Sequence, residues 1–259
     1  MENQTKDRYL INSIIRACNI MKCIANEKGS LKASDFAAHL RLDRSTVYRI
    51  LLSLESCGFI EKDEDTGGYT TGIAAFEFGN VYVSNMNFIK KSRPVMLDLS
   101  VQVQEAVHLG VLSGTEMVVV DKVDSPRSVG MICKIGHKAP GYCTAMGKVL
   151  LANRPEDELA AIVQTIELKP FTKGTITSRK RFMEEMKMIR TQGYAFDDRE
   201  HEEDVECIAA PIMDHHGHVI AAVSISGPQR KIDTPQQQHF INLVVEAASQ
   251  ISSKMGYLK

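Results

Sequence analysis

Two short amphipathic segments separated by a tight turn lie between Leu31 and Ile60, and they constrain the fold more than any other stretch. Ser34 is expected to cap the first helix and Asp43 the second. The second segment repeats apolar residues at i, i+3, i+4 and i+7, so one of its faces packs inward. These residues are Val47, Ile50, Leu51 and Leu54. With Gly58 expected at the C′ position after the second helix, the stretch predicts a helix-turn-helix.

The opposite face of the second helix is polar and is free to contact another molecule. Its side chains are of the types that bond phosphate oxygens or base edges in the major groove of DNA. The candidate DNA-binding residues are Arg41, Arg44, Ser45, Thr46, Tyr48 and Arg49. The spacing alone is also compatible with a small helical hairpin that has a polar outer face.

A further helix and a β-hairpin complete the expected N-terminal domain, residues 1–72. Residues 11–25 predict a helix with one buried stripe. This stripe consists of Ile11, Ile14, Ile15, Cys18, Met21, Ile24 and Ala25. After Ile60, an Asp-Thr-Gly-Gly turn predicts the hairpin, which makes the domain a winged helix. The hairpin is acidic at Glu61, Asp63, Glu64 and Asp65, with only Lys62 opposing, so we expect phosphates to repel its tip.

Charge gives no global sign of nucleic-acid binding, because the formal net charge is -1 and residues 1–72 hold 10 basic and 10 acidic side chains. Affinity for DNA must therefore come from the local placement of arginines. The six cysteines are scattered without a Cys-x-x-Cys pair, which favours a reducing compartment. No apolar run is long enough to span a bilayer, and the polar N-terminus lacks the apolar region of a signal peptide. We expect a cytoplasmic protein with no membrane partner.

A length of 259 residues indicates two domains. Residues 73–86 are apolar on more than one side, which predicts a linker helix and suggests a dimer. In residues 87–259, helices are predicted at 88–103, TAMGKVLLA, EDELAAIV, SRKRFMEEMKMIRTQG and TPQQQHFINLVVEAASQISSKM. Pro94 is expected in a first turn or at a kink. Strands are predicted at AVHLGVL, EMVVVDKVD, SVGMICKIG, CIAAPIM and VIAAVSISG. This order predicts an α+β sensor-like domain.

Several blocks of the chain resemble the IclR family of bacterial transcriptional regulators. They are RSTVYRILLSLESCGFI, YTTG, QEAVHLGVLSG, IGHKAPGYCTAMGKVLLA, GYAFDDRE and CIAAPIMDHHGHVIAAVSISGP. The resemblance covers nearly the whole chain and implies a winged helix joined to a C-terminal effector-binding domain of the GAF type. It also implies a homodimer or a dimer of dimers that binds double-stranded operator DNA. A small organic acid is expected to alter that binding, and repression is the expected outcome at the promoter.

The resemblance places the effector near the start of a helix that begins around Thr144, where free backbone N–H groups favour an anion. The implied pocket residues are Ala145, Met146, Asp197, Cys207, Ser224 and Ser226. The implied apolar wall residues are Met131 and Ala139. The two serines are two apart along a strand and point to the same face, which suits a small carboxylate. The family often has Leu-His where this chain has Gly141-Tyr142, so Tyr142 could contact an aromatic effector.

Other chemistry is less favoured. An enzyme of the GAF type with Cys143 or Cys207 as a redox nucleophile is the alternative function, although no partner base is placed by the sequence. Zinc could be held by Cys133, Cys143, Cys207 and His137, but packed thiols are the preferred interpretation. His215, His216 and His218 are interpreted as a polar turn and the acidic run 197–206 mostly as a solvated loop. No catalytic residue, cofactor or metal is expected. The neutral charge also leaves open a scaffold whose winged helix contacts protein.

Overall fold

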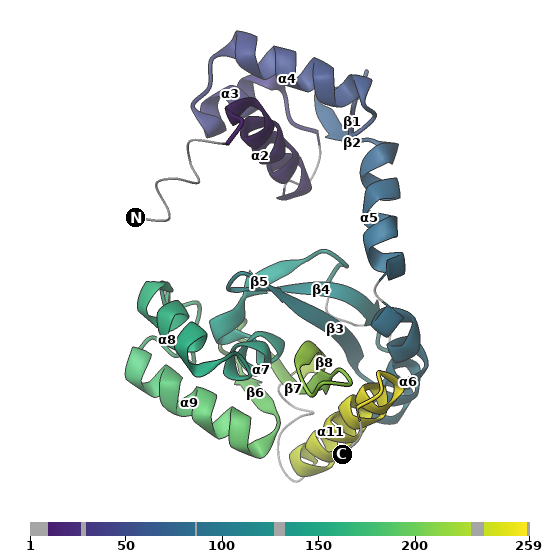
Figure 1. Cartoon of the computed structure of the whole chain (residues 1–259), viewed down its shortest axis with the longest axis vertical. Coiled ribbons are helices and arrows are strands. Elements are labelled where there is room, and N and C mark those ends of the chain that lie inside the picture. The colour runs from purple at the N-terminus through teal and green to yellow at the C-terminus, as the bar shows by residue number, and fades with distance from the viewer. Residues whose placement is uncertain (1–9, 27–29, 86, 127–132, 229–235, 258–259) are drawn as a thin grey trace. The chain divides into compact units, whose positions relative to one another are not determined.

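The computed structural model describes residues 10–26, 30–85, 87–126, 133–228 and 236–257 (Figure 1). The chain divides into two compact units, Met1–Asn85 and Met86–Lys259. None of the described helices is long and apolar enough to cross a membrane. Each unit has its own apolar core.

The first unit is a winged helix. Its elements are α2 (Asn12–Asn26), α3 (Ala33–Leu40), α4 (Arg44–Ser56), β1 (Ile60–Lys62), β2 (Tyr69–Thr71) and α5 (Ile73–Asn85). The two strands pair antiparallel, with Ile60 opposite Thr71. The buried core consists of Ile20, Ile24, Phe36, Val47, Ile50, Leu51, Leu54, Ile60 and Tyr69. The predicted apolar face of α4 is therefore the part that packs inward.

The ends of α4 agree with the prediction from sequence. Asp43 caps the helix, since its Oδ1 accepts a hydrogen bond of 2.8 Å from the Thr46 N–H. Gly58 follows the C-cap residue Cys57 with φ +72°, a conformation that glycine adopts without strain. The turn before α4 places Arg41 at φ 53°. The local sequence thus specifies both ends of this helix.

Two predictions for this unit were wrong. Ser34 does not cap α3; Lys32 is the cap residue, because its N–H donates to the Asp35 carboxylate at 2.9 Å. Of the seven residues in the stripe predicted for residues 11–25, Ile24 is buried and Met21 is half-buried, whereas the other five are exposed. Ile11 and Ile14 are 60% and 57% exposed, because the core formed by α3, α4 and the hairpin covers α2 only around Ile20 and Ile24.

The second unit is built on one antiparallel sheet with strand order β5-β4-β3-β8-β7-β6. The strands are β3 (Ala106–Ser113), β4 (Glu116–Val123), β5 (Lys138–Pro140), β6 (Ala195–Asp198), β7 (Val205–Met213) and β8 (Val219–Pro228). The helices are α6 (Asn87–Val103), η1 (Gly141–Cys143), α7 (Ala145–Ala152), α8 (Glu156–Thr165), α9 (Arg179–Gln192) and α11 (Gln237–Lys254).

Helices cover both faces of this sheet. Figure 1 shows α6 and α11 on one side and α7, α8 and α9 on the other. Each side buries its own apolar cluster against the sheet. This arrangement of helices on an antiparallel sheet confirms the predicted α+β fold class. A sheet with both faces covered can also enclose a cavity between the strands and α7.

Three local features of the second unit were predicted only in part or not at all. Pro94 lies in the interior of α6, well past its first turn, which leaves a kink as its predicted position. Of the predicted strand SVGMICKIG, residues 127–132 lie outside the described residues and Cys133–Ile135 is not a strand; the short β5 pairs with β4 instead, with Lys138 opposite Val118. The strand β6 was not predicted from the sequence, and two of its four residues are aspartates.

Candidate functional site

The predicted DNA-binding residues lie along the turn before α4 and on its outer face. Arg41, Arg44, Ser45, Tyr48 and Arg49 are exposed, and Thr46 is half-buried. Tyr48 is 54% exposed, which is high for a large aromatic side chain without a partner in the core. The structure therefore leaves five of the six side chains accessible to another molecule.

Local hydrogen bonds already use part of this surface. The Ser45 hydroxyl donates to Asp43 Oδ1 at 2.6 Å, next to the Thr46 N–H on the same oxygen. Thr46 and Arg49 also border a hollow between α4 and α2. Arg41, Arg44 and Tyr48 are consequently the members of the set whose polar groups are held least by other described residues.

The hairpin wing is acidic, and one of its carboxylates has a structural role. Asp63 Oδ1 accepts hydrogen bonds from the N–H groups of Asp65 and Thr66 at 2.9 and 3.0 Å. The bond from Thr66 is the main reason that the pKa of Asp63 lies below its usual value. Glu64 and Asp65 are exposed at the tip. The wing therefore presents the negative charges of Glu64 and Asp65 to solvent, because only Asp63 takes part in the hydrogen bonds of the turn.

A cavity of about 110 Å³ lies in the second unit between the sheet and the start of α7. Its lining comes from β3, β4, β5, β6, β7, β8 and α7 together with the loops before β5 and after β6. The lining residues are His108, Met117, Val119, Cys133, His137, Ala139, Thr144, Ala145, Met146, Asp197, His201, Glu202, Val205, Cys207, Ser224 and Ser226. Seven of the nine predicted effector residues are among them: Ala139, Ala145, Met146, Asp197, Cys207, Ser224 and Ser226.

The first turn of α7 opens onto this cavity without a side-chain cap. The Thr144 hydroxyl donates to the Pro140 carbonyl at 3.1 Å and does not cap the helix. The first backbone N–H groups of a helix have no partner within it, so those at Ala145 and Met146 are available to an anion. Gly147 is needed for this placement, because a Cβ there would lie 2.3 Å from Gly141 Cα.

Ser224 and Ser226 present two hydroxyls on one face of β8, as the strand spacing predicts. Their exposed fractions are 1% and 5%. Ser226 Oγ lies 3.1 Å from Cys207 Sγ and 3.3 Å from His108 Nδ1. Within the described part of the chain, Ser224 Oγ has no hydrogen-bond partner. Buried hydroxyls are normally paired, so Ser224 is a polar group that a ligand can satisfy.

A buried lysine lies close to Asp197 of the cavity lining, and sequence reasoning missed it. Lys148 has 0% exposure, and its Nζ donates to the Phe196 carbonyl at 2.6 Å and to Glu185 Oε1 at 3.1 Å. It also forms a short ion pair with Glu200. Burial alone would lower the pKa of Lys148, but the Glu200 and Glu185 carboxylates raise it above its ordinary value. Lys148 therefore remains charged close to Asp197.

The acidic run 197–206 is a solvated loop only in part, because four of its seven carboxylates are exposed and three are buried. Asp197, Glu200 and Glu206 are 3%, 5% and 5% exposed. The Glu200 N–H donates to Asp197 Oδ1 at 2.7 Å, while the Glu200 side chain reaches Lys148. The Lys148 ammonium compensates the desolvation of Glu200, and the Glu200 N–H compensates that of Asp197. The Glu206 carboxylate lies 3.9 Å from Arg199 Nε. The signal in the sequence was the single lysine in the otherwise apolar segment TAMGKVLLA.

Burial controls the ionisation of the cavity lining. It raises the pKa of Asp197 to about 7, with the nearby Glu200 carboxylate acting in the same direction. It lowers the pKa of His108 to about 4 and that of His201 below its usual value. His108 is therefore neutral near pH 7, whereas Asp197 titrates there.

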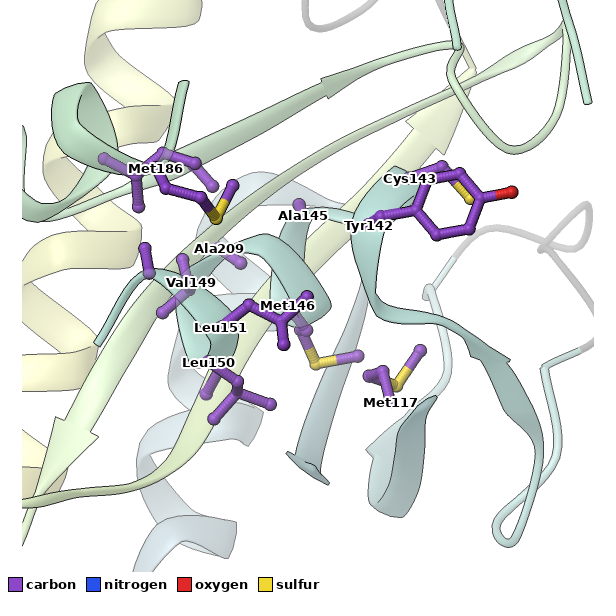
Figure 2. Close-up of a cluster of buried hydrophobic side chains, with 14 of the residues drawn as sticks. Met117, Tyr142, Cys143, Ala145, Met146, Val149, Leu150, Leu151, Met186 and Ala209 are labelled. Carbon is purple, nitrogen blue, oxygen red and sulfur yellow. The ribbon is translucent and has the colours of Figure 1, made fainter. Parts of the chain in front are cut away.

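Tyr142 does not line the cavity, which corrects its predicted role. Its hydroxyl donates to the Lys169 carbonyl at 2.7 Å, and Figure 2 shows it pointing away from Met117 and Met146. The side chain is 3% exposed because η1 turns it toward the segment after α8. Met131, which is predicted to form part of the apolar wall, lies outside the described residues.

The apolar part of the wall is formed largely by methionines that face each other. Met117 on β4 and Met146 on α7 approach in Figure 2, and both line the cavity. Their contact depends on Gly110, since a Cβ there would lie 2.9 Å from Met146 Sδ. Thioether side chains adapt to irregular ligand shapes, so this wall tolerates some variation in the carbon skeleton.

The cysteines give little support to redox or zinc chemistry. Burial raises the pKa of Cys143 to about 12, and the Asp197 and Glu200 carboxylates add to this effect. Burial also raises the pKa of Cys207. A thiol with a raised pKa is a poor nucleophile at neutral pH. Across the described segments, no group of three or more His, Cys, Asp or Glu side chains is arranged to hold a metal ion.

A winged helix with an exposed polar face on α4, in a chain that also has an α+β unit, is typical of DNA-binding transcriptional regulators. The IclR helix-turn-helix domain matches residues 13–64, and the C-terminal domain of bacterial transcriptional regulator IclR matches residues 80–253. The chain belongs to the IclR family of bacterial transcriptional regulators.

Individual relatives agree with this assignment. The chain is 33% identical over 247 residues to the HTH-type transcriptional regulator KdgR of Escherichia coli, covering 95% of this chain and 94% of that protein. The crystal structure of Thermotoga maritima IclR is 34% identical, with a TM-score of 0.73 and coverage of 95% and 99%. A third structure, an IclR homolog of Microbacterium hydrocarbonoxydans complexed with 4-hydroxybenzoate, shares the fold at 20% identity, a TM-score of 0.82 and coverage of 94% and 98%.

Proposed function

We propose that this protein is a repressor whose affinity for operator DNA changes when a small organic acid binds in the cavity of the second unit. The observation that carries the proposal is the convergence of an uncapped helix start and the unpaired Ser224 hydroxyl on one buried cavity. Backbone N–H groups and a hydroxyl are the donors that a carboxylate requires.

The proposed DNA contacts are the six residues of α4 and its preceding turn. Arg44 and Arg49 would bond base edges or phosphates, while Tyr48 and the hydroxyl residues would position the helix. Residues 1–72 form the proposed DNA-binding domain, 73–86 the linker and 87–259 the effector-binding domain. Because bacterial DNA lies in the cytoplasm, the protein would act there.

Apolar side chains on α5 support a homodimer or a dimer of dimers. Ile73, Phe76, Phe78 and Val81 are 67%, 69%, 73% and 60% exposed. An exposed apolar set of this size on one helix is typical of a surface that another subunit covers.

The effector proposal is tested with a Ser224→Ala variant. An operator sequence is first selected from a library of random DNA with the full chain. The affinity for this operator is then measured by gel shift in the presence of each of a panel of small carboxylic acids. We expect at least one acid to change the operator affinity of the parent. Because the variant loses a hydrogen bond to a charged group, its binding of that acid should be weaker by about 1.5–3 kcal/mol.

Ser113→Ala is the matched control, because Ser113 is exposed at the end of β3 and does not line the cavity. It should respond to the acid as the parent does. Equal responses of Ser224→Ala and the parent would place the ligand elsewhere.

A further inference from the structure

The cavity lacks a cationic side chain to meet an anion. The described lining includes two carboxylates, Asp197 and Glu202, but no lysine or arginine. Of its histidines, His108 and His201 have pKa values lowered by burial. A ligand carboxylate would therefore approach acidic and neutral side chains, with the α7 N-terminus as its main source of positive potential.

The nearest buried cation is already engaged. Lys148 binds Glu185, Glu200 and the Phe196 carbonyl, so two carboxylates face one ammonium group. Glu200 is buried and Glu185 is half-buried, so an ionised Asp197 would add a third negative charge near Lys148, and a ligand carboxylate a fourth. Like charges in a buried site cannot all remain ionised without a large energetic cost.

We propose that the cavity binds its carboxylate ligand together with one proton, which Asp197 holds; this inference rests on the proposed function of the cavity. The protonated carboxyl donates its O–H to a ligand oxygen, and the N–H groups of Ala145 and Met146 donate to the ligand carboxylate. No covalent bond forms. The net step is the transfer of one ligand anion and one proton from solvent into the site.

The surroundings of Asp197 identify which groups control this proton. On its own strand and loop, Oδ1 accepts from the Glu200 N–H, while Glu200 and Lys148 contribute opposite charges. Cys207 on β7 and Cys143 in η1 also feel the Asp197 charge, and burial raises both thiol pKa values. The remaining titratable groups of the described lining are Cys133, His108, His137, His201 and Glu202. Among them, His137 is the alternative source of a pH-dependent ligand affinity, since a protonated imidazole would also attract an anion. A test must therefore distinguish the effect of His137 from that of Asp197.

Methionine methyl groups provide a direct reporter of cavity occupancy, because Met117 and Met146 both line it. The full chain is prepared with isotope-labelled methionine methyl groups and titrated with lactate, a small carboxylate probe, from about pH 5.5 to about pH 8.5. The shifts of these two methyl signals give the dissociation constant at each pH. Three variants accompany the parent: Asp197→Asn, His137→Gln and Glu202→Gln.

Above the pH at which Asp197 ionises, lactate affinity of the parent should fall about tenfold per pH unit, the slope for one bound proton. Asparagine donates and accepts as the protonated acid does, so the affinity of Asp197→Asn should vary less than about twofold over the same range. His137→Gln and Glu202→Gln should keep the parent slope.

A parent affinity that is independent of pH would overturn the proposal. So would a full slope in Asp197→Asn, a slope abolished by His137→Gln, or the absence of any lactate-induced shift of Met117 and Met146. Failure of the proposed function is distinguishable, because the acid panel on operator DNA is a separate readout. If an acid changes operator affinity while its own binding to the cavity does not depend on pH, that result would support the proposed ligand-responsive function and contradict only the uptake of a proton by Asp197.

Discussion

The outer face of α4 and the cavity beside α7 are both polar surfaces, but they differ in how they are held. The α4 face comes from one helix and its preceding turn, and its main residues are exposed. The cavity is assembled from six strands, one helix and two loops, and most of its polar groups are buried. An exposed polar face costs little stability, whereas buried polar groups must be compensated by partners. Substitutions in the two regions should therefore differ in effect. Those on the α4 face should alter DNA binding alone, and those around the cavity should alter both the stability of the protein and ligand binding.

The largest expected effect is that of Lys148→Met. Removal of the ammonium group leaves Glu200 buried without its cation, which should lower the free energy of unfolding of the second unit by about 3–5 kcal/mol. Urea denaturation followed by circular dichroism measures the loss. Lys138→Met is the matched control, because Lys138 forms an exposed ion pair with Glu116 and should change stability by less than about 1 kcal/mol. Equal losses in the two variants would contradict the contrast between buried and exposed charges.

A smaller effect is expected from the pH dependence of stability in Asp197→Asn. The pKa of Asp197 is raised from 3.8 to about 7, so the folded protein keeps this proton to a higher pH than the unfolded chain. The contribution of Asp197 to stability is fully present below about pH 4 and is lost as the pH rises toward 7. Relative to the parent, the variant should gain up to about 4 kcal/mol between these limits, at about 1.4 kcal/mol per unit of pKa shift.

Comparison of variant and parent at each pH isolates this carboxyl from His108, whose lowered pKa gives the opposite trend. Parallel stability curves for the variant and the parent would show that Asp197 is ionised in the folded protein across this range.

On the α4 face, Arg44→Ala should weaken binding to the selected operator by about 1–3 kcal/mol while the melting temperature stays unchanged. Arg49→Ala should do the same if its side chain leaves the hollow beside α2 to contact a base edge. Gel-shift titration and thermal denaturation give the two readouts. An unchanged operator affinity would remove that arginine from the contact set, and a lowered melting temperature would show that the face is not independent of the core.

The smallest effect concerns the acidic wing. Glu64→Lys with Asp65→Lys should raise affinity for random DNA and steepen its salt dependence, by a slope of about 0.9 for each new phosphate contact. Asp63 is left intact because its carboxylate holds the turn. Anisotropy titrations at several salt concentrations provide the measurement. If random DNA binds the double variant and the parent equally, the wing does not approach the phosphate backbone.

The same contrast explains which features could be predicted from the sequence. The limits of α4 follow from Asp43 and Gly58, and its buried face follows from spacing within a few residues. The paired serines of β8 follow from the period of a strand. Such signals are local, and the family resemblance extended them to most of the cavity.

The features that could not be predicted depend on contacts between distant segments. Lys148 in α7 is buried because Glu185 of α9 and Glu200 after β6 surround it, 37 and 52 residues further along the chain. The short strand β6 was hidden by its carboxylates, which are normally signs of solvent exposure. Tyr142 turned away from the cavity because the Lys169 carbonyl accepts its hydroxyl. In each case a tertiary partner overrides the local preference.

The most direct test of coupling between the cavity and operator binding uses an acid that shifts the methyl signals of Met117 and Met146. Operator affinity is measured by anisotropy without this acid and with the acid at saturation, for the parent and for Ser224→Ala. We predict that saturation changes the operator affinity of the parent by about tenfold or more, as expected of a coupling free energy above about 1.4 kcal/mol. The variant should need about ten- to a hundredfold more acid for the same change. An operator affinity that stays constant while the acid fills the cavity would contradict the coupling.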